Sequence, residues 1–147
     1  MGHSAGAHLA MMTAYTHNNE HKIKACVSWA GPLNFIDTTQ LSIPASHLVF
    51  KKYTGADIAG SLDSLAWKES SPYWVVSPDC PATLLIYGTN DIGVPFCNAQ
   101  DFKNKLDKFK VINSLLIMSG KGHIFFGATL DKAIEESFNW CKKYLFD

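Results

Sequence analysis

Gly2-His3-Ser4-Ala5-Gly6 is the stretch from which the fold of this chain can be worked out. It has the pattern G-x-S-x-G, in which a serine lies on a sharp turn between a strand and a helix, the nucleophile elbow. The backbone of such a turn is strained and crowded, so the flanking glycines suit it. Good helix formers follow over residues 7–15, as the motif requires. Taken alone, the pentapeptide also fits a glycine-rich loop before a helix, so the rest of the chain has to decide.

The composition is that of one folded domain. The chain has 147 residues, of which 47% are hydrophobic and 12% aromatic, which suffices for a core and argues against disorder. Charge is balanced, with Lys+Arg 13 and Asp+Glu 13, and every basic residue is a lysine. The chain therefore has no excess of positive charge that would favour binding to nucleic acid or to an anionic membrane surface. No apolar run reaches the roughly 18 residues that a membrane-spanning helix needs.

The cysteines and histidines do not form a recognisable metal motif. No C-x-x-C pair is present, and no cysteine lies near a histidine at zinc spacing. The preferred interpretation is that the four cysteines are free thiols and mostly packed as small hydrophobes: Cys26, Cys80, Cys97 and Cys141. This favours a reducing compartment such as the cytoplasm without determining the localisation. His17 and His21 have the spacing of a helical metal site, but they lie in a polar turn, where a solvated loop is the preferred interpretation. We therefore expect neither a metal nor another cofactor.

Apolar patterns along the chain predict an α/β fold. They indicate, in order, a helix over 4–17, a strand over 24–29, an irregular insert over about 33–80, a strand over 83–87, a helix over 95–108, a strand over 111–118 and a helix over about 130–146. Within the insert, short helices are expected over 45–53 and 62–68, and a connection of this length is typical of a lid or pocket wall. Strands that alternate with helices predict a parallel sheet of about three strands, covered by helices on both faces.

Each long predicted helix has a face that should pack on the sheet. The helix over 4–17 is small and apolar on most of its circumference. The helix over 95–108 has an apolar stripe made of Phe96, Ala99, Phe102, Leu106 and Phe109. The last helix has a stripe with intervals of four, four, three and four residues, made of Leu130, Ile134, Phe138, Cys141 and Leu145.

Three chemically active side chains follow predicted strand ends. Ser4 heads the first helix, Asp91 follows the strand over 83–87, and His123 follows the strand over 111–118. In doubly wound folds, active groups gather at the carboxyl ends of the strands. Asp91 alone could be a turn residue, and His123 alone could be a loop histidine that Gly122 lets approach closely. Together, in this order, they predict a nucleophile, an acid and a base in one site.

The residues around these positions resemble the α/β-hydrolase esterases, in particular the acetyl-esterase/lipase-like and kynurenine-formamidase-like branches. The resemblance lies in residues 2–8, in the stretch 70–95 that leads through Pro81 to Asp91 and Pro95, and in Gly122-His123. It covers essentially the whole chain. The resemblance implies Ser4, Asp91 and His123 as the catalytic triad, with the Ala5 N–H as one oxyanion donor.

The chain departs from that family at its beginning. The family has half of its sheet before the elbow, together with a His-Gly-Gly loop that donates the second oxyanion N–H, whereas only Met1 precedes Gly2 here. We therefore expect a partial α/β-hydrolase fold, the C-terminal half. The strand over 24–29 should then have an unpaired edge, which a second copy or a partner chain is expected to cover.

The expected activity is that of a serine hydrolase that cleaves small carboxylic esters through an acyl-enzyme, without a cofactor. Two alternatives stay open, an aryl-formamide amidase of the same fold and a non-catalytic module that only folds or associates. Among the aromatic residues near the predicted site, Phe125 and Trp29 are the candidates for a substrate pocket, although core packing also explains them.

Overall fold

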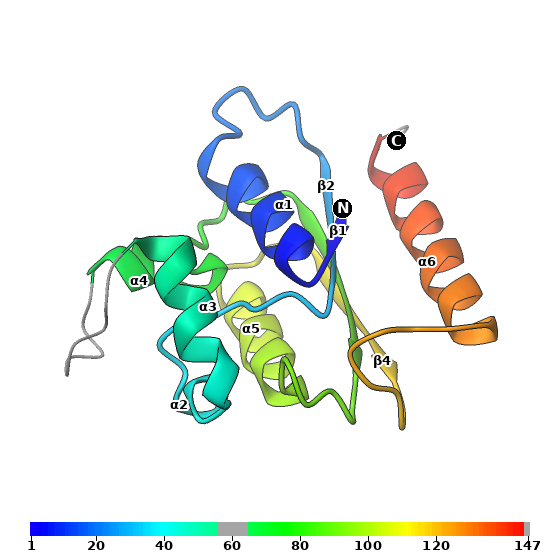
Figure 1. Cartoon of the computed structure of the whole chain (residues 1–147). Helices are drawn as coiled ribbons and strands as arrows, with labels where there is room; N and C mark the ends of the chain where they lie inside the picture. The colour runs from blue at the N-terminus through cyan, green and yellow to red at the C-terminus, as the bar shows by residue number, and fades with distance from the viewer. Residues whose placement is uncertain (56–64, 146–147) are drawn as a thin grey trace.

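The computed structural model describes residues 1–55 and 65–145, which contain a four-stranded parallel sheet with the order β1-β2-β3-β4 (Figure 1). The strands are β1 (Gly2–His3), β2 (Ala25–Trp29), β3 (Ala82–Gly88) and β4 (Asn113–Met118). The predicted α/β arrangement is confirmed, and β2, β3 and β4 lie close to the predicted bounds. The additional strand, β1, has too few residues to produce an alternating pattern in the sequence.

Helices cover both faces of the sheet. On one face, α1 (Ala5–Thr16) and α5 (Phe96–Lys108) pack against Leu85 and Tyr87 of β3. On the other face, α6 (Ala128–Leu145) packs against Leu84 and Ile86 of the same strand. Successive side chains of a strand point to opposite faces, and all of β3 is buried, as expected for a central parallel strand.

The orientation predicted for the last helix is wrong in part, because Leu130 and Cys141 of the predicted stripe pack against the core but its other members do not. Ala133 and Ser137 face the sheet, where small side chains allow close approach, and Ser137 accepts a hydrogen bond of 2.9 Å from the Trp29 indole. Ile134 and Phe138, which were expected in the core, are 52% and 66% exposed. Glu136, Asn139 and Lys143 line a groove beside β4, so the helical repeat places Ile134 and Phe138 on the opposite flank, toward β1. Leu145 at the end of the predicted stripe is also exposed.

The insert between β2 and β3 contains α2 (Thr38–Leu41), α3 (Pro44–Thr54), α4 (Leu65–Glu69) and the short 3-10 helix η1 (Pro72–Trp74). The helix predicted over 45–53 corresponds to α3. The helix predicted over 62–68 corresponds to α4 from Leu65 on, whereas residues 62–64 lie outside the described part. Phe35, Phe50 and Trp67 form a separate aromatic core that holds these pieces together.

The open edge of the sheet differs from the prediction. Gly2 pairs with Ser28 and His3 with Trp29, so β1 covers the carboxyl end of β2 and is itself the edge strand. Among the described residues, the remainder of β2, from Ala25 to Val27, has a sheet partner only in β3. No helix in the described ranges is long and apolar enough to cross a bilayer.

Candidate active site

Ser4 stands on a strained turn between β1 and α1. Its φ of 54° and ψ of −122° lie outside the regions that a serine ordinarily adopts, and its N–H donates to the Trp29 carbonyl at 2.8 Å. Gly2 is required there, because a Cβ would lie 2.3 Å from the backbone of Gly6. At Gly6 a Cβ would meet nothing within 4 Å, so the requirement for small flanking residues holds at one side of the serine only.

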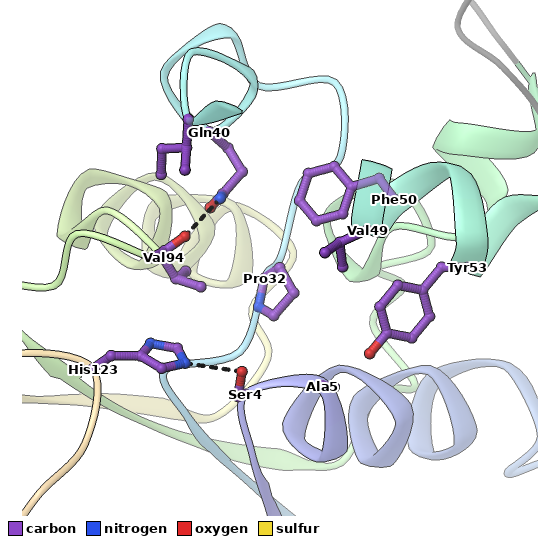
Figure 2. Close-up of a pocket in the computed structure, with 11 residues that line it drawn as sticks. Ser4, Ala5, Pro32, Gln40, Val49, Phe50, Tyr53, Val94 and His123 are labelled. Carbon is purple, nitrogen blue, oxygen red and sulfur yellow. Dashed lines mark hydrogen bonds between the residues drawn. The ribbon is translucent and has the colours of Figure 1, made fainter. Parts of the chain in front are cut away.

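The three residues that the sequence singled out lie together. His123 Nε2 is 2.9 Å from Ser4 Oγ, and His123 Nδ1 is 2.8 Å from Asp91 Oδ2 (the Ser4–His123 bond is drawn in Figure 2). The arrangement fits a neutral imidazole that donates from Nδ1 to the carboxylate and accepts at Nε2 from the hydroxyl. Such a chain can take a proton from the serine as its oxygen attacks an electrophile.

Backbone amides hold Asp91 in position. The carboxylate is buried, and Oδ1 accepts hydrogen bonds of 2.8 Å from the N–H groups of both Gly93 and Val94. Oδ2 is thereby directed to the imidazole. The loops that carry Asp91 and His123 approach closely at Gly88, where a Cβ would lie 2.2 Å from the Lys121 carbonyl oxygen. Gly88 therefore allows the approach that was expected from Gly122.

His3 supports the base from the other side. Its Nε2 donates to the backbone carbonyl of His123 at 2.8 Å, and the two rings lie 5.0 Å apart. The variable position before the serine thus connects β1 to the loop after β4. The motif alone does not reveal this contact, because the G-x-S-x-G pattern leaves that position open.

The start of α1 offers a donor for a developing negative charge. Ala5 lies in the first turn of α1 and lines the cavity beside Ser4. Amides in the first turn have no acceptor within the helix, so this N–H is available to an oxyanion. Ala5, which the sequence predicted as an oxyanion donor, therefore lies at the start of α1 beside the cavity.

A cavity of about 200 Å³ opens beside Ser4 and His123 (Figure 2). Its apolar lining comes mainly from the insert and from the loop after β3: Pro32, Ile43, Val49, Phe50, Tyr53 and Val94. The Gln40 side chain donates to the Gly93 carbonyl at 2.9 Å and so links α2 to that loop. The sequence marked the insert as a pocket wall but identified none of these residues, because they follow no periodic pattern.

The aromatic residues proposed for the pocket are elsewhere. Phe125 is buried against α6 in the core on the other face of the sheet, and Trp29 packs near it with ring centres 6.2 Å apart. Neither belongs to the described lining of the cavity. The loop turns after His123, so a residue two positions away points into the core.

The histidine on α1 that follows Ser4 by one turn is structural. His8 is buried, stacks on Phe35 with ring centres 4.7 Å apart, and donates from Nε2 to the Ser70 carbonyl at 2.7 Å. Burial lowers the pKa of His8 below its ordinary value, and the bond to the carbonyl offsets part of that effect. A neutral His8 thus joins α1 to the insert.

The remaining titratable groups form no further centre. His17 ends α1 and is exposed, as is His21. The described ranges contain no group of three histidine, cysteine or acidic residues that could hold a metal ion. All four cysteines are free, and burial raises the pKa of the Cys26 thiol to about 12.

Comparison with solved structures identifies the fold as part of an α/β hydrolase. The native Est2 esterase of the planctomycete Thermogutta terrifontis is 22% identical, with a TM-score of 0.72 over 97% of this chain and 53% of the esterase. A puromycin-hydrolyzing peptidase of Mycobacterium tuberculosis is 21% identical, with a TM-score of 0.79 over 98% of this chain and 21% of the peptidase. The chain spans about half the length of the esterase structures.

Sequence comparison assigns the family. A search of curated proteins found no match. The profile of the BD-FAE family matches residues 1–106, which include the elbow, the insert and the candidate acid. This match covers more than half of the chain, and the chain therefore belongs to the BD-FAE family.

Proposed function

We propose that this chain holds the nucleophile, base and acid of a serine hydrolase that cleaves small carboxylic esters. The observation that carries the proposal is the hydrogen-bonded chain from Ser4 through His123 to Asp91, with distances of 2.9 and 2.8 Å. Membership of the BD-FAE family and the fold shared with esterases support it.

The geometry is suited to acyl transfer in two steps. Ser4 Oγ attacks the ester carbonyl carbon while its proton moves to His123 Nε2, and the carbonyl oxygen becomes an oxyanion beside the Ala5 N–H. The tetrahedral intermediate collapses, the bond to the alcohol oxygen breaks, and His123 returns the proton to that oxygen. Water then attacks the acyl-enzyme by the same route, which releases the acid and restores Ser4. Asp91 keeps the imidazole in the required tautomer and stabilises its charged form.

The structural relatives are consistent with small acyl substrates. The Thermogutta terrifontis esterase is known with butyrate and with propionate bound, and also phosphonylated by sarin. The cavity beside Ser4 is apolar and small, which is compatible with a substituent of that size. We extend to this chain the expectation of a short-chain ester and of reaction with organophosphorus reagents.

A second oxyanion donor is expected to complete the site. An oxyanion is usually bound by more than one donor, and loss of one donor costs about 10²–10³ in rate. The exposed flank of α6 and the edge strand β1 lie on the side of the sheet where further structure would pack. A second copy or a partner chain that pairs with β1 would brace the strained turn at Ser4.

A fluorophosphonate probe tests the proposal, because it reacts with an activated serine and needs no turnover. We expect labelling of the wild-type chain, loss of labelling in Ser4→Ala, and wild-type labelling in Ser119→Ala, which alters an exposed serine after β4. Absence of Ser4-dependent labelling would favour the non-catalytic alternative. Faster turnover of N-formylkynurenine than of p-nitrophenyl acetate would favour the formamidase alternative over the esterase.

A further inference from the structure

The wall of the cavity that faces Ser4 comes largely from α3. Val49, Phe50 and Tyr53 project from this helix toward the space above Ser4 and His123 (Figure 2). They lie within about one helical turn of each other, so one face of one helix supplies this wall. The size of the cavity therefore depends on how α3 is held relative to α1.

Contacts between aromatic rings hold α3 in place relative to α1. Phe50 is buried and stacks on Phe35 with ring centres 4.1 Å apart and planes at 16°. Phe35 in turn stacks on His8, and Tyr53 approaches His8 edge-on at 5.1 Å. Because His8 lies on α1 one turn after Ser4, these rings tie the wall to the helix that carries the nucleophile.

Val49 differs from its neighbours on this wall. Phe50 belongs to the aromatic core and cannot be shortened without loss of packing, whereas Val49 is 43% exposed and lies outside that core. Its side chain faces the cavity from the rim. A substitution at Val49 therefore changes the space above Ser4, while the ring contacts of Phe50 and Tyr53 still hold α3 against α1.

The lining also restricts charge and size. Among the lining residues that the structure describes, no lysine, aspartate or glutamate is present, so a buried ionic group would lose its hydration without gaining an ammonium or carboxylate partner. The volume of about 200 Å³ is below the roughly 300–1,000 Å³ of pockets that enclose drug-sized ligands. The cavity thus fits a short and uncharged hydrocarbon group.

We propose that the cavity receives a short, uncharged apolar substituent of the substrate and that Val49 is the residue that sets its accepted length. The inference rests on the proposed attack by Ser4. It goes further by naming the residue that determines specificity, because neither the shared fold nor the family indicates which side chain limits the length of the substituent.

Two alkyl phosphonofluoridates, one with a short and one with a long alkyl chain on phosphorus, provide the test. They react once with Ser4, so the ratio of the labelling rates for the long and the short reagent measures the fit of the chain alone. Val49→Ala enlarges the cavity, and we expect the ratio to rise by about fourfold or more, the value of one buried methylene. Val49→Trp fills the cavity, and we expect the ratio to fall about tenfold.

Leu48→Ala is the matched control, because Leu48 is the preceding residue of α3, is 60% exposed, and is not part of the described lining. Its ratio should equal that of the wild type. Unchanged ratios in both Val49 variants, with Ser4 still labelled, would overturn the role of Val49 and leave the proposed hydrolysis intact. Absence of labelling with either reagent would overturn both. Circular dichroism of each variant verifies that α3 and the rest of the fold are retained.

Discussion

The backbone of Ser4 adopts a φ of 54°, a conformation that glycine tolerates and other residues disfavour. Such strain costs about 1–3 kcal/mol and persists only where the surroundings impose it. Here the pairing of β1 with β2 on one side and the start of α1 on the other impose it. The strain lifts the hydroxyl toward His123, so part of the folding free energy is used to present the nucleophile.

Two variants isolate this strain. Ser4→Gly and Ser4→Ala both lose the hydroxyl and its bond to His123, but only glycine relieves the backbone. We expect the free energy of unfolding of Ser4→Gly to exceed that of Ser4→Ala by about 1 kcal/mol, measured by urea denaturation. A Ser4→Ala variant that is more stable than Ser4→Gly would show that the turn is not strained, because glycine costs unfolded-state entropy at an unstrained position.

Single residues differ in how far the sequence predicts their place. Ser4, Asp91 and His123 could be located because each follows a strand end, and strand ends of a parallel sheet converge. Phe125 was misplaced because closeness to His123 along the chain does not determine the direction of its side chain. The need for glycine was correctly inferred at Gly2 but wrongly at Gly6, since only the geometry reveals which backbone approaches which.

At the scale of elements, α1 and the insert are joined through a histidine that must be neutral. Burial lowers the pKa of His8, so the unfolded chain binds its proton more readily than the folded chain does. The stabilisation is complete above the ordinary pKa of 6.5 and is lost as the pH falls below that value toward the folded pKa. Acid should therefore loosen the contact between α1 and the segment that includes Ser70.

The prediction concerns how stability varies with pH in the wild type and in His8→Phe. We expect the wild type to lose more stability than His8→Phe between about pH 8 and about pH 5, because phenylalanine cannot take up a proton. Urea denaturation at several pH values measures the difference. His17→Phe, which alters an exposed histidine, serves as the control and should follow the wild type. Parallel curves for wild type and His8→Phe would contradict the assignment.

The elements also show what periodicity can and cannot predict. The strand β3 and the helix α5 were located closely because an unbroken apolar run and a strong stripe leave few alternatives. In α6 the predicted stripe holds for Leu130 and Cys141, which pack against the core, but Ala133 and Ser137 are buried in place of Ile134 and Phe138. A stripe identifies an apolar flank, not the surface that it meets. The insert offered neither signal, so its contribution to the cavity could not be foreseen.

At the scale of the whole molecule, the two faces of the sheet are covered unequally by helices. Two helices cover one face of the sheet, whereas α6 alone covers the opposite face in the described ranges (Figure 1). Met1, which precedes the edge strand β1, is exposed, and so are Ile134 and Phe138 on the flank of α6 that faces away from β4. An exposed apolar surface beside an unpaired strand edge is a site of association.

In the purified chain a second copy is the available partner. We expect the chain to associate with itself, and the double variant Ile134→Lys/Phe138→Lys to raise the dissociation constant at least about tenfold, because each lysine places a charge in an apolar contact. Size-exclusion chromatography with light scattering over a concentration series gives the measurement. Glu135→Lys alters an exposed residue of the same helix and should leave association unchanged. A wild-type chain that stays monomeric at every concentration would contradict this prediction.

The hydrogen bond between Ser4 and His123 joins residues 119 positions apart, and that between His123 and Asp91 joins residues 32 positions apart. Contacts between such distant residues form only after much of the chain entropy has been lost, so they belong to the late stages of folding. Until β1 has paired with β2 and β4 has paired with β3, Ser4 carries an ordinary hydroxyl without a base. Reactivity toward the phosphonate therefore also reports folding, because only molecules in which Ser4 and His123 have been brought together can react.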